Sequence, residues 1–136
     1  TKAGHSAIFS TTGNDDCHVI LRGGKEPNFD AVSVQAGCDL LTKAGVPPRL
    51  MVDLSHANSS KDHERQKVAG AAVAEQLRSA QGNVLGVMIE SHLVAGKQSL
   101  SDDLTYGQSI TDACIGWDDT VVLLDQLASA NARSGN

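Results

Sequence analysis

The stretch Leu50-Met51-Val52-Asp53-Leu54-Ser55-His56-Ala57-Asn58 joins a short apolar run to a polar cluster. Similar apolar runs occupy 17–21 (CHVIL) and 84–89 (VLGVMI). Continuous apolarity of this kind is typical of strands that are buried on both faces of a parallel sheet. The three runs begin at 17, 50 and 84, and spacings of 33 and 34 residues match the length of a βα repeat. The sequence therefore predicts an α/β protein with parallel strands.

Helical patterns separate and follow these runs. Asp30 is the predicted N-cap of a first helix that stops at Gly45, just before a proline pair. Ser59 or Ser60 is expected to cap a second helix that ends at Gly82, with two acidic residues complementing the dipole of its first turn. A third helix begins near Trp117. The expected apolar faces are Ala31, Val34, Cys38 and Leu41 in the first helix, Val68, Ala71, Ala72 and Leu77 in the second, and Val121, Leu124, Leu127 and Ala128 in the third.

The length of 136 residues suits one compact domain and is too short for two. Doubly wound sheets and β/α barrels both fit the repeat, yet three strands are few for either sheet. The first residue is Thr1 rather than methionine, which fits processing or a piece of a longer protein.

Composition excludes several classes of function. The net charge is −5, from 11 basic and 16 acidic residues, which gives no electrostatic footprint for nucleic acid. No apolar run reaches the 18 or so residues that a membrane span needs, and no signal peptide is recognisable. Cys17, Cys38 and Cys114 lack metal-site spacing, so we expect buried, reduced thiols in a cytoplasmic protein.

Polar side chains follow each strand at its carboxyl end, where β/α proteins collect functional groups. His56 and Glu90 follow neighbouring strands, which lie roughly 5 Å apart, so both can reach one ion. A histidine with carboxylates suits Mn, Fe, Co or Zn. The spacing also fits a hydrogen-bonded His–Glu pair without metal, which the residues alone favour slightly. Arg22, before two glycines, is a candidate for binding phosphate or carboxylate, with a surface ion pair as the alternative.

Asp112 lies in the long loop 91–115, where it is either a third oxygen ligand or the cap of a helical turn. A serine nucleophile is not indicated, because the chain has no G-x-S-x-G elbow. Ser55 and His56 are moreover expected to point apart if the strand continues through them.

Four segments together carry a family resemblance: 13–24, 53–61 (DLSHANSSK), 86–92 (GVMIESH) and 109–117 (SITDACIGW). In order and in spacing they resemble the class I 3-deoxy-D-arabino-heptulosonate 7-phosphate (DAHP) synthases. The resemblance implies a (β/α)8 TIM barrel, of which residues 1–136 would form the C-terminal portion of a single domain, about three βα units. The remaining units would lie N-terminal to Thr1.

The resemblance also implies roles for individual residues. His56, Glu90 and Asp112 match three of the four ligands of a divalent metal, and Arg22 matches a residue that holds the phosphate of phosphoenolpyruvate. The family's cysteine ligand belongs to an earlier strand, so Cys114 is not expected to bind the metal. The family's Lys-Pro-Arg-Thr loop, which contacts phosphoenolpyruvate and the second substrate, erythrose 4-phosphate, would also precede this chain.

The implied reaction condenses phosphoenolpyruvate with erythrose 4-phosphate, giving DAHP and phosphate, the first step of the shikimate pathway. The metal would act as Lewis acid on the aldehyde oxygen, with His56 among its ligands and with Asp112 or a metal-bound water moving the proton. The full-length protein is expected to be a homo-oligomer, whereas the 136 residues alone are expected to be inactive. Two alternatives stay open: an inactive half-barrel that acts only through self-association or complementation, and a related enzyme making 3-deoxy-octulosonate 8-phosphate.

Overall fold

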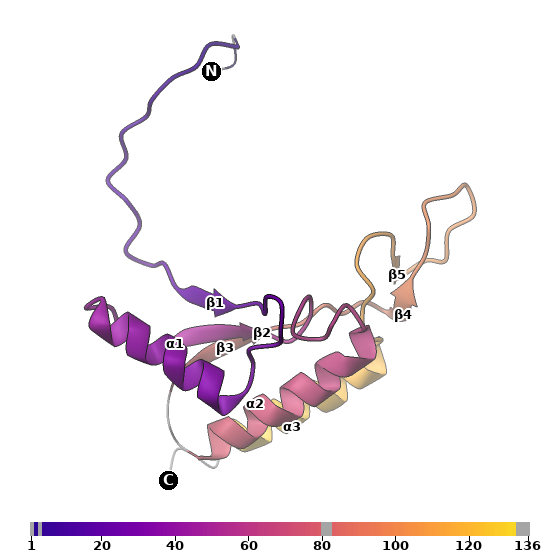
Figure 1. The fold of residues 1–136 in the computed structure, drawn as a ribbon. Helices are drawn as coiled ribbons and strands as arrows, with labels where there is room; N and C mark the ends of the chain where they lie inside the picture. Colours follow the sequence, from indigo (N-terminus) through magenta and orange to yellow (C-terminus); the bar gives the residue numbers. More distant parts are fainter. Residues whose placement is uncertain (1, 3, 80–82, 133–136) are drawn as a thin grey trace.

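A three-stranded parallel sheet forms the centre of the structure, a computed structural model that describes residues 2, 4–79 and 83–132 (Figure 1). Strand β2 (Leu50–Asp53) lies between β1 (Val19–Leu21) and β3 (Val84–Met88). Leu50 pairs with Val19 on one side and with Val84 on the other. The predicted parallel α/β fold is confirmed in this part of the chain.

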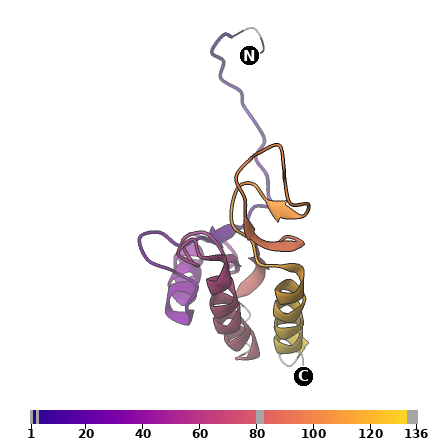
Figure 2. The same cartoon turned by 90° about the vertical axis from the view of Figure 1, so that its right-hand side faces the viewer.

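All three long helices lie along one face of the sheet, as Figures 1 and 2 show from two directions. They are α1 (Ala31–Lys43), α2 (Gln66–Arg78) and α3 (Trp117–Ala132), and a short 3-10 turn, η1 (His63–Arg65), precedes α2. The segment before β1 runs away from this body as an extended arm (Figure 1). The sheet is therefore covered on one side by the helices of this chain.

One-sided packing makes the expectation of strands buried on both faces wrong here. In β2 and just beyond it, Leu50, Val52 and Leu54 are fully buried and join the core formed with the helices, whereas Met51 between them is half-buried. In β1 the side chains of Val19 and Ile20 are each 43% exposed. The physical reason is that no described segment covers the second face or the outer edge of β1.

The first helix is capped as the sequence predicts. The Asp30 side chain accepts a hydrogen bond from the Ser33 backbone N–H at 3.0 Å, and Val34 and Cys38 are buried. After the helix, Gly45 adopts a left-handed φ of 73°, a conformation in which the missing Cβ removes the steric penalty.

The predicted cap of the second helix is wrong. Ser59 and Ser60 lie in a tight turn, where the Ser60 and Lys61 backbones are left-handed with φ of 55° and 63°. Asp62, whose backbone is extended, caps the turn η1 by accepting a hydrogen bond from the Glu64 N–H at 3.0 Å. The N-cap position of α2 itself is Arg65, whose side chain makes no capping hydrogen bond. The helix ends at Arg78, and the predicted stop at Gly82 lies outside the described residues.

The apolar faces predicted for α2 and α3 are also largely wrong, because these two helices pack against each other as well as against the sheet. The buried stripe lies between them, so that Val68 is 62% and Leu124 is 47% exposed. The buried residues are Gln66, Ala69, Gly70, Val73 and Ala74 in α2, and Thr120, Leu123, Leu127 and Ala130 in α3.

The long loop 91–115 contains a small sheet that the sequence pattern did not predict. Strands β4 (Val94–Lys97) and β5 (Gln108–Ser109) pair in parallel, and Gly96 exchanges two backbone hydrogen bonds with Cys114. These short strands carry little apolar periodicity: three of the four residues of β4 are exposed, and β5 consists of two polar residues. Within the described ranges, no helix is long and apolar enough to cross a membrane.

The three cysteines are free, but only Cys38 and Cys114 are buried as expected, whereas Cys17 is exposed. Burial raises the pKa of both the Cys38 and the Cys114 thiols. Cys17 is exposed because it precedes β1 at the open edge of the sheet.

These environments predict unequal reactivity toward a thiol reagent such as 5,5′-dithiobis(2-nitrobenzoate) in native protein. Cys17 should react quickly, while Cys38 and Cys114 react slowly, because the thiolate is the nucleophile and burial suppresses it. The measurement is the absorbance time course, and the fast phase should vanish in a Cys17→Ser variant. A fast phase that persists in this variant would contradict the assignment.

The turn after β1 packs closely on the loop after β2, and Gly23 makes the approach possible. A Cβ at Gly23 would lie 2.8 Å from the Ala57 Cβ and 2.8 Å from the Asn58 backbone nitrogen. Gly23 also has a φ of 77°, which L side chains rarely adopt. The neighbouring Gly24 has neither restriction, since a Cβ there would meet nothing within 4 Å.

The glycine pair therefore offers a matched test. Gly23→Ala should lower the free energy of unfolding by about 2 kcal/mol or more, because it combines a left-handed backbone with a contact against main-chain atoms. Gly24→Ala should change it by less than about 0.5 kcal/mol. Urea unfolding followed by circular dichroism gives both values, and equal values for the two variants would refute this packing.

Candidate metal and anion site

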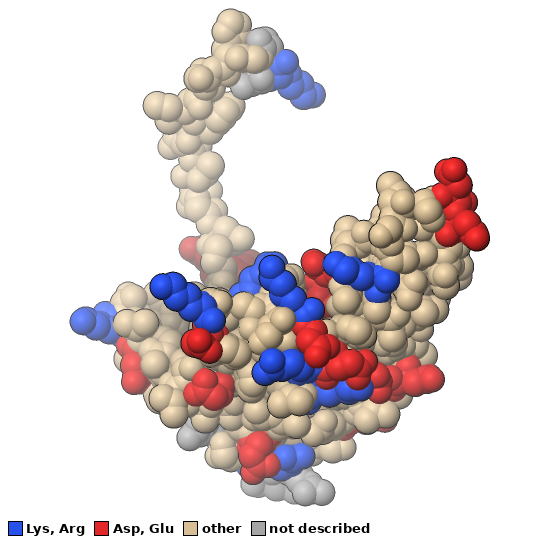
Figure 3. All heavy atoms as spheres, turned by 45° about the vertical axis from the view of Figure 1, so that its right-hand side comes forward, with Lys and Arg blue, Asp and Glu red and all other residues tan. Residues whose placement is uncertain are grey.

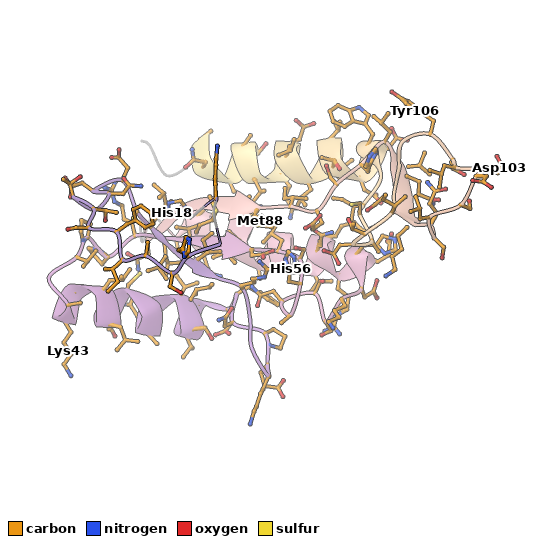
Figure 4. All side chains as sticks on the ribbon, turned by 90° about the horizontal axis from the view of Figure 1, so that it is seen from above. His18, Lys43, His56, Met88, Asp103 and Tyr106 are labelled. Atoms are coloured by element: carbon orange, nitrogen blue, oxygen red, sulfur yellow. The ribbon has the colours of Figure 1, made fainter. Side chains whose placement is uncertain are left out.

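The carboxyl ends of β1, β2 and β3 open into one pocket of about 480 Å³. Arg22 follows β1, His56 lies in the loop after β2 and Glu90 follows β3, and all three line the pocket. Asp112 reaches it from the loop beyond β5. Figure 4 places His56 beyond the sheet, with Asp103 and Tyr106 far out in the loop that carries β4 and β5. The structure thus brings together all four residues selected from the sequence.

His56, Glu90 and Asp112 form a compact cluster. The His56 Nε2 lies 3.5 Å from Glu90 Oε1 and 4.0 Å from Asp112 Oδ2. One donor atom from each residue falls within 4.8 Å of the others. An imidazole nitrogen with two carboxylate oxygens is a donor set that suits Mn, Fe, Co or Zn, so these residues fit a first-row divalent ion.

The other ring nitrogen of His56 faces into the protein. Its Nδ1 lies 2.7 Å from Oδ2 of Asp53, a carboxylate that is fully buried at the end of β2. Asp53 Oδ1 also accepts hydrogen bonds from the Ser55 backbone N–H at 2.8 Å and from Ser55 Oγ at 2.7 Å.

The expectation that Ser55 and His56 point apart is wrong. Ser55 Oγ lies 2.6 Å from His56 Nδ1, because the strand ends at Asp53 and His56 itself has a left-handed φ of 51°. The alternation of side chains that holds within a strand does not extend into this turn. Both side chains instead converge on the Asp53 carboxylate.

Glu90 is held through its backbone by Gln66, the first residue of α2. The Gln66 side chain donates to the Glu90 carbonyl and accepts from the Glu90 N–H, each at 2.9 Å. Gln66 is fully buried, so the pair replaces the hydrogen bonds that a neighbouring strand would supply. The side chain of Glu90 stays 27% exposed toward the pocket.

Asp112 depends on the strand pairing of its loop. The Ile115 N–H donates to the Glu90 carbonyl at 3.0 Å, and the His92 N–H donates to the Ile115 carbonyl at 3.0 Å. These bonds fix the segment after Asp112 beside the end of β3. The Asp112 side chain is 68% exposed, and Cys114 lies beneath it with Sγ 3.9 Å from Glu90 Oε2.

The cationic side of the pocket comes from three elements. The Arg22 side chain is 60% exposed, and its Nε lies 3.9 Å from Asp53 Oδ2. Lys61, from the left-handed turn after β2, and Lys97, from β4, line the same pocket. Figure 3 shows basic and acidic side chains interspersed on the face in view. An acidic protein therefore keeps a local group of cations that suits a small anion.

Sequence reasoning missed Asp53, Gln66, Lys61 and Lys97. A carboxylate inside the otherwise apolar run 50–54 was the available signal for Asp53, because a buried charge needs partners. Lys61 ends the polar segment that follows the same strand. Gln66 and Lys97 carried no such signal, since their roles depend on how α2 and β4 pack.

Comparisons with known proteins agree over nearly the whole chain. The model of the DAHP synthetase I family matches residues 1–125. The Phe-sensitive phospho-2-dehydro-3-deoxyheptonate aldolase of Escherichia coli (strain K12) is 56% identical over 138 aligned residues, which cover 99% of this chain and 39% of that protein. The phospho-2-dehydro-3-deoxyheptonate aldolase of Haemophilus influenzae is 54% identical, covering 96% of this chain and 37% of the other.

A solved structure shows the same fold. The phospho-2-dehydro-3-deoxyheptonate aldolase from Francisella tularensis SCHU S4 superposes with a TM-score of 0.90 at 45% sequence identity, covering 100% of this chain and 40% of that one. The chain thus spans about two fifths of the length of the proteins it matches. Since the family model and these relatives cover almost every residue, the chain belongs to the DAHP synthetase I family.

Proposed function

We propose that this chain supplies the metal site and an anion-binding arginine of a DAHP synthase, which condenses phosphoenolpyruvate with erythrose 4-phosphate and releases phosphate. The observation that carries the proposal is the cluster of His56, Glu90 and Asp112 beside Arg22 in one pocket. The relatives' names, all phospho-2-dehydro-3-deoxyheptonate aldolases, favour the seven-carbon product over an eight-carbon one.

Each residue has a defined task in this proposal. His56, Glu90 and Asp112 hold the divalent ion, Mn, Fe, Co or Zn, through one nitrogen and two carboxylate oxygens. When bound, the ion supplies Lewis acidity toward the aldehyde oxygen of erythrose 4-phosphate. In the proposed reaction the methylene carbon of phosphoenolpyruvate forms a bond to the aldehyde carbon, and the aldehyde oxygen takes up a proton. Water adds at C2 and loses its protons, and the C2–O bond to the phosphoryl group breaks, so that C2 becomes a ketone and phosphate leaves. Asp112, the most exposed of the three, is the candidate for accepting or returning a proton.

Arg22 binds and orients the phosphate of phosphoenolpyruvate. Its guanidinium is exposed to the pocket and has the planar geometry that pairs with two phosphate oxygens. Its nearest acidic neighbour, Asp53, is 3.9 Å away and already accepts shorter hydrogen bonds from Ser55 and His56. The guanidinium therefore keeps most of its donors available to a ligand. Lys61 and Lys97 add positive charge on the same side.

We further propose that residues 1–136 form the C-terminal portion of one (β/α)8 barrel domain. Helices along one face of a curved parallel sheet, with polar clusters at the carboxyl ends of the strands, are the arrangement that a barrel repeats. The uncovered face of the sheet would then point into the barrel. Free cysteines suit the reducing cytoplasm, where we place the protein, and the full-length protein would be a homo-oligomer.

Manganese affinity tests the ligand assignment. In the 136-residue chain, His56→Ala and Glu90→Gln should each weaken Mn²⁺ binding by more than about 100-fold. Loss of a residue that only hydrogen-bonds to a metal ligand already costs about 10- to 100-fold, and loss of a ligand should cost more. Isothermal titration calorimetry gives the affinities. His18→Ala is the matched control, because this exposed histidine lies outside the pocket lining and should leave the affinity unchanged. Equal affinities in the His56→Ala and His18→Ala proteins would refute the site.

A chimera tests the reaction itself. Residues 1–136 replace the matching segment of the Phe-sensitive E. coli relative, whose remaining part supplies the other barrel units. We expect DAHP formation from both substrates with Mn²⁺, and a loss of at least 100-fold in kcat/KM for Arg22→Ala within the chimera, since removal of a phosphate-orienting cation weakens transition-state binding. The measurement is the consumption of phosphoenolpyruvate followed by absorbance.

Two outcomes would count against the proposal. A chimera that folds and binds Mn²⁺ but forms no DAHP would refute the assigned reaction, while turnover by the 136 residues alone would refute their assignment as part of a barrel. Self-association of the chain remains the second candidate role, favoured by the exposed Val19 and Ile20 on the edge strand β1. It predicts an inactive oligomer in size-exclusion chromatography of the separate chain.

A further inference from the structure

The Asp53 carboxylate is the most deeply buried charged group near the pocket, and it does not belong to the metal-ligand cluster. Its exposed fraction is 0%, although it faces two residues of the site. Oδ2 lies 2.7 Å from His56 Nδ1, and Oδ1 accepts two hydrogen bonds from Ser55. A buried carboxylate is costly unless each oxygen has such partners.

The hydrogen bonds fix which nitrogen of His56 carries the proton. An ionised carboxylate can only accept, so the short contact at Oδ2 requires a proton on Nδ1. Ser55 cannot supply that proton, because its hydroxyl donates to Asp53 Oδ1 and presents only its oxygen to the ring. The lone pair of a neutral His56 is then left on Nε2, the atom that faces Glu90 and Asp112.

We propose that Asp53 is a positioning residue that selects the Nδ1–H tautomer of His56 and thereby presents Nε2 as a metal ligand. The inference rests on the proposed metal site and adds a residue that does not itself touch the ion. Histidine ligands commonly donate their second ring N–H to a carboxylate, which fixes both tautomer and ring orientation. Here the turn makes this possible, because the left-handed backbone of His56 folds the ring back over Asp53.

The isosteric Asp53→Asn variant reverses the tautomer for a clear reason. The Ser55 N–H and hydroxyl both donate to the Oδ1 position, so the amide oxygen is retained there. The amide NH2 then occupies the Oδ2 position and donates to His56 Nδ1, which drives the ring proton to Nε2. That proton occupies the lone pair that a metal ion would use.

The test uses the 136-residue chain without metal, at a pH high enough that its His56 signals no longer change with pH, so that the neutral ring is observed. Long-range ¹H–¹⁵N spectra report the histidine tautomers, and the His56 signals are assigned by their absence in His56→Ala. We expect the Nδ1–H form in the wild type and the Nε2–H form in Asp53→Asn. We also expect Asp53→Asn to weaken Mn²⁺ binding by 10- to 100-fold. Asp30→Asn is the matched control, since asparagine caps α1 equally well and the charge change is identical.

The outcomes separate this inference from the proposed metal site. A wild-type His56 in the Nε2–H form, or an unchanged tautomer in Asp53→Asn, would overturn the role of Asp53. If Asp53→Asn fails to fold by circular dichroism, the wild-type tautomer alone decides. A wild-type chain that binds no Mn²⁺ counts against the metal site, whereas the tautomer still decides whether Asp53 positions His56.

Discussion

The amide side chain of Asn58 joins the two strand ends on which the site depends. It is almost fully buried, and its Nδ2 donates to the carbonyls of Leu21, at 3.1 Å, and of Asp53, at 2.6 Å. Its Oδ1 accepts from the Asn28 N–H at 2.7 Å, so three of its hydrogen-bonding positions are used. Because β1 and β2 stop at these carbonyls, one side chain fixes the points at which Arg22 and His56 leave the sheet. Gly23 must then approach this loop without a Cβ.

The sequence predicted the site better than the packing around it. Parallel strands end at one edge of a sheet, and this rule alone placed His56 and Glu90 together. The Asp30 cap and the ends of the three strands, to within one residue, followed from equally local signals, whereas the first strand begins at Val19 and not at Cys17. The buried faces of α2 and α3 did not, because Val68 and Leu124 have the correct helical spacing but lie away from the seam between the helices. Periodicity identifies an apolar stripe, whereas the partners of a helix decide which stripe is buried.

The turn after β2 shows a second limit of sequence reasoning. The directions of the Ser55 and His56 side chains could be predicted only by assuming that the strand continued, and the left-handed His56 backbone contradicts that assumption. No pattern of residue types predicts a positive φ at this histidine, since glycine is the usual residue there and a positive φ is uncommon for every other residue type. Such strain persists only where surrounding contacts enforce it, and the hydrogen bonds to Asp53 supply that enforcement. The left-handed backbone of His56 therefore helps to orient its imidazole ring.

Under the proposed function, the ligands of the metal and the cations for the two phosphorylated substrates are held in different ways. The three candidate metal ligands belong to this chain and are fixed by contacts within it. Asp53 holds His56, Gln66 holds Glu90, and the pairing around Ile115 holds the segment that carries Asp112. The three cations that line the pocket are exposed, and Arg22 is the one that lies at the edge strand β1. A ligand with several negative charges needs more donors than this edge supplies, so its affinity depends on whatever lies beyond β1. Under the proposed function, this chain accordingly supplies three ligands of the ion by itself, whereas turnover would require the rest of the proposed barrel.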